Sequence, residues 1–277
     1  PLGDNITGGL IHSANSNNLG WISEAQWVSH TLPTSATVEQ LWYQRYHFIA
    51  SSSAIINEIA KGSIVVDSDV SNILGQSYAY RAWAYYQLIT HYAKGYLIGN
   101  PSTDPGVPLQ LGSVSPYQSG PRVTVAKIYE QMEDDINEAI THFENSSKTF
   151  GGANGKSNIS INAAYGIKAR IALSKGDWVT AASAAAMARQ GYPLLNETQY
   201  KSGFNTLDLS EVIWGGNVID TETTFFRSYF YLVSPTFIGR HNTADKKIID
   251  TVRDAQNPDT DYRKDILLAV APNTNIS

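Results

Sequence analysis

The feature that most constrains the fold of this chain is a pair of short helical patterns between residues 160 and 193. Ser160 is placed to cap the first helix, and a Gly176-Asp177 turn ends it. Asp177 is in turn placed to cap a second helix, which we expect to end near Gly191. The spacing therefore predicts an antiparallel helical hairpin.

Small residues inside this hairpin match the tetratricopeptide repeat. Alanines allow two helices to approach closely, and Pro193 stands where the repeat ends. A lone repeat cannot bury its apolar face, and about three are needed for stability. We therefore expect other helices to stack against the hairpin. The hairpin residues that match the contact positions of the repeat are Tyr165, Ala169, Ala181, Ala185 and Ala188.

Three further helices are predicted from the spacing of apolar residues, at 38–61, 69–93 and 124–145. Gly62 is expected as the C-cap of the first helix and Thr124 as the N-cap of the third. These helices match the repeat poorly, but they are the candidates for stacking against the hairpin.

The connecting segments predict irregular structure with short strands. Residues 97–121 hold five prolines, so this segment cannot be helical. We expect a strand around Val107–Leu111 and a second one at Val212–Trp214.

The expected fold is mostly α, a tetratricopeptide-like scaffold with long loop-rich insertions and a few short strands. We expect one domain over residues 1–277. Its helical scaffold lies mainly at 38–193, and residues 194–277 form a loop-rich aromatic part.

Composition limits the functions open to the chain. Charged residues make up 16% and the net charge is −5, so no basic surface for nucleic acid or an anionic membrane is expected. No apolar run approaches the roughly 18 residues that span a bilayer. The 16 Tyr, 8 Phe and 6 Trp favour neutral polar ligands, because Tyr and Trp join an apolar face to a hydrogen-bonding edge. Most individual rings are nevertheless expected in the core.

The sequence predicts no catalytic residue, no metal site and no cofactor. The chain has no cysteine, and no two of its six histidines have the spacing of a zinc hydrolase motif. Four carboxylates on the third helix are interpreted as a solvated face, and the glycine-rich loop at 151–157 lacks the first glycine of a phosphate loop. The carboxylates are Glu130, Glu133, Asp134 and Glu138.

Four segments stand in a distinctive order along the chain. They are Leu41–Tyr46 with Ile49 and Ile55-Ile56, Tyr80–Leu88 with Gly106–Leu109, Val125–Ile140 running into Ala163–Trp178, and Ser210–Trp214 with a weaker Asp261–Arg263. In this order they resemble the SusD/RagB family of nutrient-binding lipoproteins from Bacteroidetes. The second pair, an Arg-Ala-aromatic helix followed by a Val-Pro-Leu extension, is the most specific signal.

The chain also departs from the family. Ser53 falls near a position where the family usually has Asn, and a longer, proline-broken loop joins Tyr92 to Val107. The lipidated cysteine and the C-terminal helical region are absent, so the chain is expected to be a fragment. A lipid anchor in the membrane is thus implied by the resemblance alone.

The resemblance implies a non-catalytic protein on the extracellular face of the outer membrane. It would bind an oligosaccharide and pass it to a partner TonB-dependent, SusC-like transporter. Three alternatives stay open at this point. They are a RagB-like peptide-binding protein of the same fold, a cytoplasmic tetratricopeptide adaptor for another protein, and a glycoside hydrolase, which would need two suitably separated carboxylates.

The candidate ligand-binding residues are chosen for their loop-like context and their chemistry. Rings can stack on sugar faces, while amide and guanidinium groups bond hydroxyls. Trp83 and Trp178 lie in helical patterns and are assigned to packing instead. The candidates are the rings Trp21, Trp27, Tyr229 and Tyr231, with Asn18 and Arg240 as hydroxyl partners.

Overall fold

The computed structural model describes residues 6–8, 32, 34–112, 120–148, 155–203, 206–217 and 242–244. The chain divides into two compact units, which are treated separately. One, the helical unit, comprises residues 39–195 and 205–217. The other comprises residues 1–38, 196–204 and 218–277.

In the second unit the structure describes a short sheet and one short helix. Strands β1 (Ile6–Gly8) and β4 (Asn242–Ala244) pair antiparallel. Helix α8 (Glu197–Lys201) begins with a capping box, in which Asn196 and Gln199 bond each other's backbone N–H groups.

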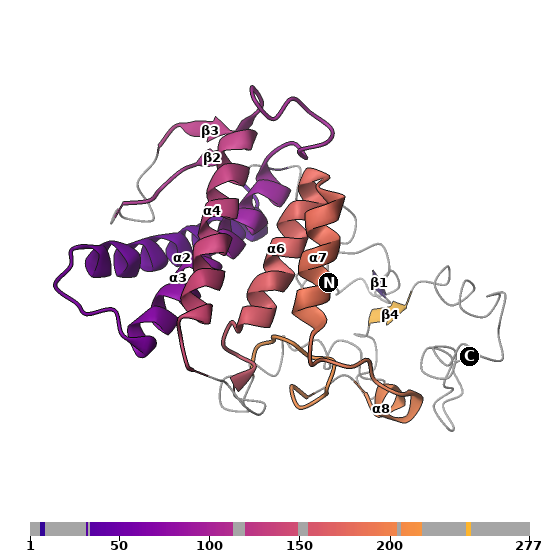
Figure 1. Ribbon diagram of the computed structural model, residues 1–277. Coiled ribbons are helices and arrows are strands. Elements are labelled where there is room, and N and C mark those ends of the chain that lie inside the picture. Colours follow the sequence, from indigo (N-terminus) through magenta and orange to yellow (C-terminus); the bar gives the residue numbers. More distant parts are fainter. Residues whose placement is uncertain are drawn as a thin grey trace. The chain divides into compact units, whose positions relative to one another are not determined.

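The helical unit confirms the mostly α fold, and its helices stack side by side (Figure 1). Helix α3 packs on α4, α4 on α6, and α6 on α7. Thr124 caps α4 as expected, since its side chain accepts a hydrogen bond from the Lys127 N–H. The helices are α2 (Ala36–Ala60), α3 (Ser68–Tyr92), α4 (Val125–Glu144), α6 (Ile161–Lys175) and α7 (Trp178–Arg189).

The predicted hairpin is confirmed in α6 and α7. The Ser160 side chain caps α6, and that of Asp177 caps α7 by accepting from the Thr180 N–H. Gly176 joins the helices with φ +85°, a left-handed conformation that costs glycine little. The helices run antiparallel, because Asn162 at the start of α6 donates to carbonyl groups at the end of α7.

The contact positions of α7 are confirmed only in part. Ala181 and Ala188 are buried, but Ala185 is exposed and Ala184 is buried in its place. Positions 181, 184 and 188 follow the three- and four-residue spacing of a single helix face. The two helices pack closely at this face, since a Cβ atom on Gly166 of α6 would lie 3.9 Å from the Cβ atom of Ala188.

The first strand lies slightly earlier than predicted. Strand β2 (Pro105–Pro108) pairs antiparallel with β3 (Arg122–Thr124). From Pro108 on, side chains of α2 and α3 bond the carbonyl groups of the chain, and no regular structure follows the strand. The Tyr46 hydroxyl donates to Pro108 O and the Tyr85 hydroxyl to Gln110 O.

The predicted strand at Val212–Trp214 is wrong. Val212 and Ile213 have no regular structure and Trp214 lies in a bend, so this stretch pairs with no strand in the described part of the chain. The Val212 N–H donates to Leu209 O within a turn, and the Gly215 N–H donates to Lys156 O. Single backbone bonds and side-chain contacts hold the segment instead of a ladder.

The core of the helical unit lies where α3, α4 and α6 meet. Ile128, Met132 and Ile136 of α4 are fully buried there. Gly75 of α3 permits a close approach, because a Cβ atom at this position would come within 2.8 Å of the Phe143 ring. In the described part of the chain, no helix is long and apolar enough to cross a membrane.

Candidate ligand-binding surface

The six ligand-binding residues predicted from sequence lie outside the described residues. They are Asn18, Trp21, Trp27, Tyr229, Tyr231 and Arg240. A candidate surface is therefore built from the described rings of the helical unit.

The two tryptophans assigned to packing have different environments. Trp83 is partly buried and packs against the core, as expected. Trp178 is 61% exposed, so its assignment to packing is wrong. It is the first residue of α7, and most of its side chain is open to solvent.

Five rings form a continuous row on the helical unit, named here the aromatic band. Phe48 stacks on Tyr80 at 6.0 Å between ring centroids, and Tyr80 meets Trp214 edge to face at 6.2 Å. Trp214 meets Trp83 at 5.9 Å, and Trp83 stacks on Tyr86 at 5.6 Å. Phe48 is 46% exposed, and the other four rings are partly buried. The band thus offers both ring faces and polar ring edges.

The sequence of α3 explains why these rings gather. Tyr80, Trp83 and Tyr86 recur at intervals of three residues and therefore lie along one side of the helix. Tyr85 and Leu88, which are fully buried, lie on the opposite side and pack in the core. The three rings are therefore partly buried and pack against the edge of the core.

Trp214 reaches the band because its segment is bonded to residues 155–157. The indole Nε1–H donates to Ser157 O at 3.3 Å, and the Lys156 ammonium donates to Leu209 O at 2.8 Å. The Lys156 ammonium also lies 5.9 Å from the centre of the Tyr192 ring. Lys156 of the glycine-rich loop is therefore bound to protein groups.

A hydrogen-bond donor lies at the Phe48 end of the band. The Arg45 guanidinium carbon is 5.8 Å from the centre of the Phe48 ring. Burial lowers the pKa of Arg45. Within the described part of the chain its Nε atom is buried and has no hydrogen-bond partner. A guanidinium carries further N–H donors, so Arg45 can supply hydrogen bonds to a ligand beside Phe48.

A buried ion pair lies beneath the band and was missed by the sequence analysis. Arg81 of α3 donates to both carboxylate oxygens of Asp135 on α4, with N–O distances of 2.8 and 2.6 Å. The Ser53 hydroxyl of α2 accepts a hydrogen bond from Arg81 at 3.1 Å. The pair ties the helices that carry the band to α4.

The pair has the geometry of two ionised groups, because two N–H donors face two carboxylate oxygens. Burial raises the pKa of Asp135, while hydrogen bonds from Arg81 and Gln131 oppose the rise. A signal for the pair was present in the sequence. Asp135 falls on the apolar stripe of α4 beside Met132 and Ile136, where an unpaired charge is costly.

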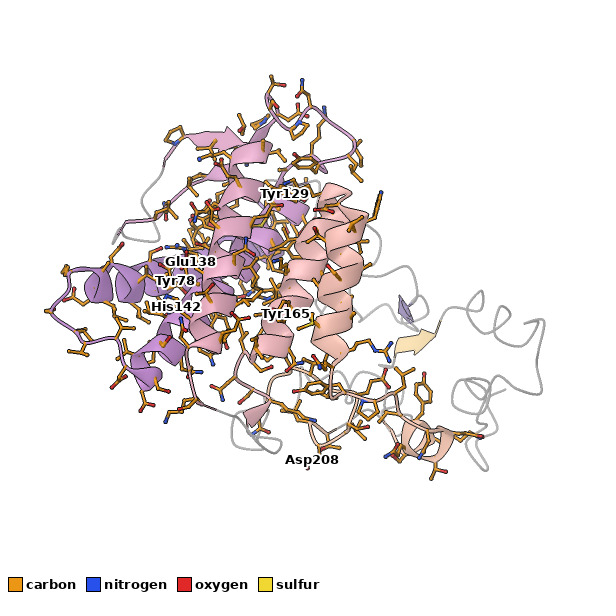
Figure 2. All side chains as sticks on the ribbon, in the orientation of Figure 1. Tyr78, Tyr129, Glu138, His142, Tyr165 and Asp208 are labelled. Atoms are coloured by element: carbon orange, nitrogen blue, oxygen red, sulfur yellow. The ribbon has the colours of Figure 1, made fainter. Side chains whose placement is uncertain are left out.

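Tyr78, Glu138 and His142 form a second polar group where α3 meets α4 (Figure 2). The Tyr78 and His142 rings stack at 5.7 Å, and the Ser71 hydroxyl lies 3.2 Å from His142 Nδ1. Burial lowers the pKa of His142, and the negative charge of Glu138 opposes this shift.

The carboxylates of α4 do not converge on a site. Glu130, Asp134 and Glu138 are exposed, as a solvated face requires. Glu133 pairs with Lys175 of α6 at 2.7 Å. Among the described residues, no group of three or more His, Asp or Glu side chains is placed to hold a metal ion.

The fold and the aromatic band define a class of protein, namely a helical-repeat scaffold that carries a candidate ligand-binding surface of aromatic rings. The sequence model of a SusD-like family, described as starch-binding and associating with the outer membrane, matches residues 4–173. This match spans more than half of the chain. The chain therefore belongs to the SusD-like family. No curated protein matches it.

Solved structures of SusD proteins share the fold. A SusD superfamily protein from Bacteroides vulgatus ATCC 8482 has a TM-score of 0.73 and 20% identity, over 95% of this chain and 57% of that one. One from Bacteroides fragilis has a TM-score of 0.70 and 22% identity, over 88% and 54%. A laminarin-binding SusD-like protein has a TM-score of 0.51 and 19% identity, over 69% and 39%. The chain thus spans about half the length of the first two.

Proposed function

We propose that this protein binds an oligosaccharide at the outer surface of the cell and passes it to a TonB-dependent, SusC-like transporter. Membership of a starch-binding family that associates with the outer membrane supports the proposal. The observation that carries it is the aromatic band, since its rings can lie against the C–H faces of sugars. A lipid anchor is the expected means of membrane association.

We further propose two separate sets of candidate ligand-binding residues, one in each compact unit. One set is the aromatic band, with Arg45 as a hydroxyl partner. The other set comprises the loop residues predicted from sequence. They are Trp21, Trp27, Tyr229 and Tyr231, with Asn18 and Arg240.

The proposed function is binding without catalysis, in a single domain over residues 1–277. Cleavage of a glycosidic bond needs two carboxylates roughly 5–10 Å apart on either side of the sugar. The acidic residues of α4 are either exposed or engaged with Arg81 and Lys175. This distribution supports a role in capture.

A glycan array probed with the purified 277-residue chain tests the proposal. We expect one class of neutral oligosaccharide to bind, and chromatography after prolonged incubation to recover it at its original length. Shorter sugars would contradict the non-catalytic role. Binding to a peptide library but to no glycan would contradict sugar capture and favour a RagB-like function.

A further inference from the structure

The segment that carries Trp214 has little regular structure of its own. Residues 206–217 form turns, bends and irregular backbone, and they are named here the Trp214 arm. The arm folds closely on itself, because a Cβ atom on Gly215 would come within 2.7 Å of Leu207 Cδ2. A segment without a helix or a strand depends on contacts with the rest of the chain to keep one position.

Lys156 holds the Trp214 arm at two points. Its ammonium group donates to Leu209 O at 2.8 Å, and its own backbone carbonyl accepts from the Gly215 N–H at 3.1 Å. Leu209 and Gly215 are six residues apart, and Trp214 lies between them. A single residue therefore anchors the arm on both sides of the indole.

The Lys156 ammonium has a second partner in the protein. It lies 5.9 Å from the centre of the Tyr192 ring, within the range of a cation–π attraction. Its bond to Leu209 O has an ionised donor, which makes it stronger than a bond between neutral groups. Because the ammonium is engaged with a carbonyl group and a ring, its effect on a ligand must pass through the arm.

The anchored arm determines where the Trp214 ring lies. The residue next to Lys156 takes part, since the Trp214 indole Nε1–H donates to Ser157 O at 3.3 Å. In the aromatic band the ring meets Tyr80 edge to face at 6.2 Å and Trp83 at 5.9 Å. Two neighbouring loop residues thus fix the indole against rings that come from α3.

We propose that Lys156 is a positioning residue of the aromatic band, which holds Trp214 where its ring contacts a sugar and does not touch the sugar itself. This inference rests on the proposed function. Without the ammonium, Leu209 O loses its charged donor, and Trp214 spends less time in the band. Binding then has to order the arm again, and this cost lowers the affinity.

Calorimetric titration with the oligosaccharide selected on the array tests the role in binding. Lys156→Met keeps a long side chain but removes the ammonium, and it should raise the dissociation constant by about fivefold or more, the order of one lost hydrogen bond. Lys168→Met removes the same charge from a lysine that donates to Asn137 of α4, so it should bind as wild type does.

A double variant separates positioning from a general structural role. In a chain that already carries Trp214→Ala, Lys156→Met should have no further effect on affinity, because its route to the sugar has been removed. An additional loss in the double variant, or equal affinities of Lys156→Met and wild type, would overturn the proposal.

Hydrogen exchange measured without sugar tests the anchoring of the arm by itself. The amide groups of Val212 and Gly215 should exchange faster in Lys156→Met than in wild type, and at the wild-type rate in Lys168→Met. Exchange within α4 should be equal in all three, as a check that the helical core is folded. Unchanged exchange at Gly215 in Lys156→Met would overturn the proposal. If the wild-type chain binds no glycan, the proposed function fails together with the role of Lys156 in it, whereas faster exchange still confirms that Lys156 anchors the arm.

Discussion

At the scale of single residues, the Arg81–Asp135 pair is the most consequential contact in the helical unit. Both side chains are almost fully buried, at 6% and 1% exposure, and each satisfies the other through two hydrogen bonds. Such a pair adds little over a well-packed apolar pair, but the loss of one partner leaves a buried charge without compensation. The pair therefore fixes how α3 and α4 pack.

Replacing Asp135 by Asn should destabilise the protein by about 3–5 kcal/mol, because Arg81 then stays buried without its counter-charge. The neighbouring Asp134 is exposed, so Asp134→Asn should change stability by less than about 0.5 kcal/mol. Urea unfolding followed by circular dichroism measures both. Equal midpoints for the two variants would show that the pair does not hold the helices.

His142 should make stability depend on pH. Burial lowers the pKa of His142, so the unfolded chain takes up its proton first as the pH falls. Stability is then complete above the unfolded pKa of about 6.5 and falls at lower pH. We expect His142→Gln to lose less stability than wild type between about pH 7 and 5. Thermal unfolding midpoints of variant and wild type, measured across this pH range, test the prediction.

At the scale of elements, the α6–α7 hairpin depends on small residues at one face. Ala188 is 4% exposed and lies against α6, whereas Ala185 is exposed on the same helix. The tight contact leaves no room for a longer side chain. A larger residue at position 188 would therefore strain the packing of the two helices.

Ala188→Leu should therefore destabilise the protein by about 1–3 kcal/mol through overpacking. Ala185→Leu makes the same chemical change at an exposed site and should stay within about 0.5 kcal/mol of wild type. Denaturant titration of the two variants compares them. A larger loss for Ala185→Leu would mean that the helix face is wrongly assigned.

Helices and caps could be predicted from the sequence because their determinants are local. Ser160, Thr124 and Asp177 each bond a backbone group within a few residues. The buried face of α7 was predicted only in part, since Ala184 and Ala185 are adjacent and have the same side chain. Local patterns decide that a helix forms, but its contacts also depend on the helix beside it.

The candidate surface could not be predicted in the same way, because distant segments form it. Arg81 and Asp135 are 54 residues apart, and Trp214 is 57 residues from the Ser157 carbonyl that holds it. The strand expected at Val212–Trp214 failed for the same reason. Its apolar residues pack on the helices instead of pairing with a strand.

At the scale of the whole molecule, a SusD-like scaffold carries the partly buried aromatic band against a core of aliphatic and small residues with four buried rings, Tyr46, Tyr85, Tyr129 and Phe143. The arrangement separates stability from recognition. Ring substitutions in the aromatic band should therefore change binding more than folding, and the reverse should hold for the buried residues of α4.

Calorimetric titration with the oligosaccharide selected on the array tests the central claim, that the aromatic band binds the sugar. Trp214→Ala should weaken binding by about 1–3 kcal/mol, the usual cost of losing a stacked ring. Trp178→Ala, an exposed tryptophan outside the band, should bind as wild type does. Unchanged affinity in a folded Trp214→Ala variant, or an equal loss in Trp178→Ala, would contradict the claim.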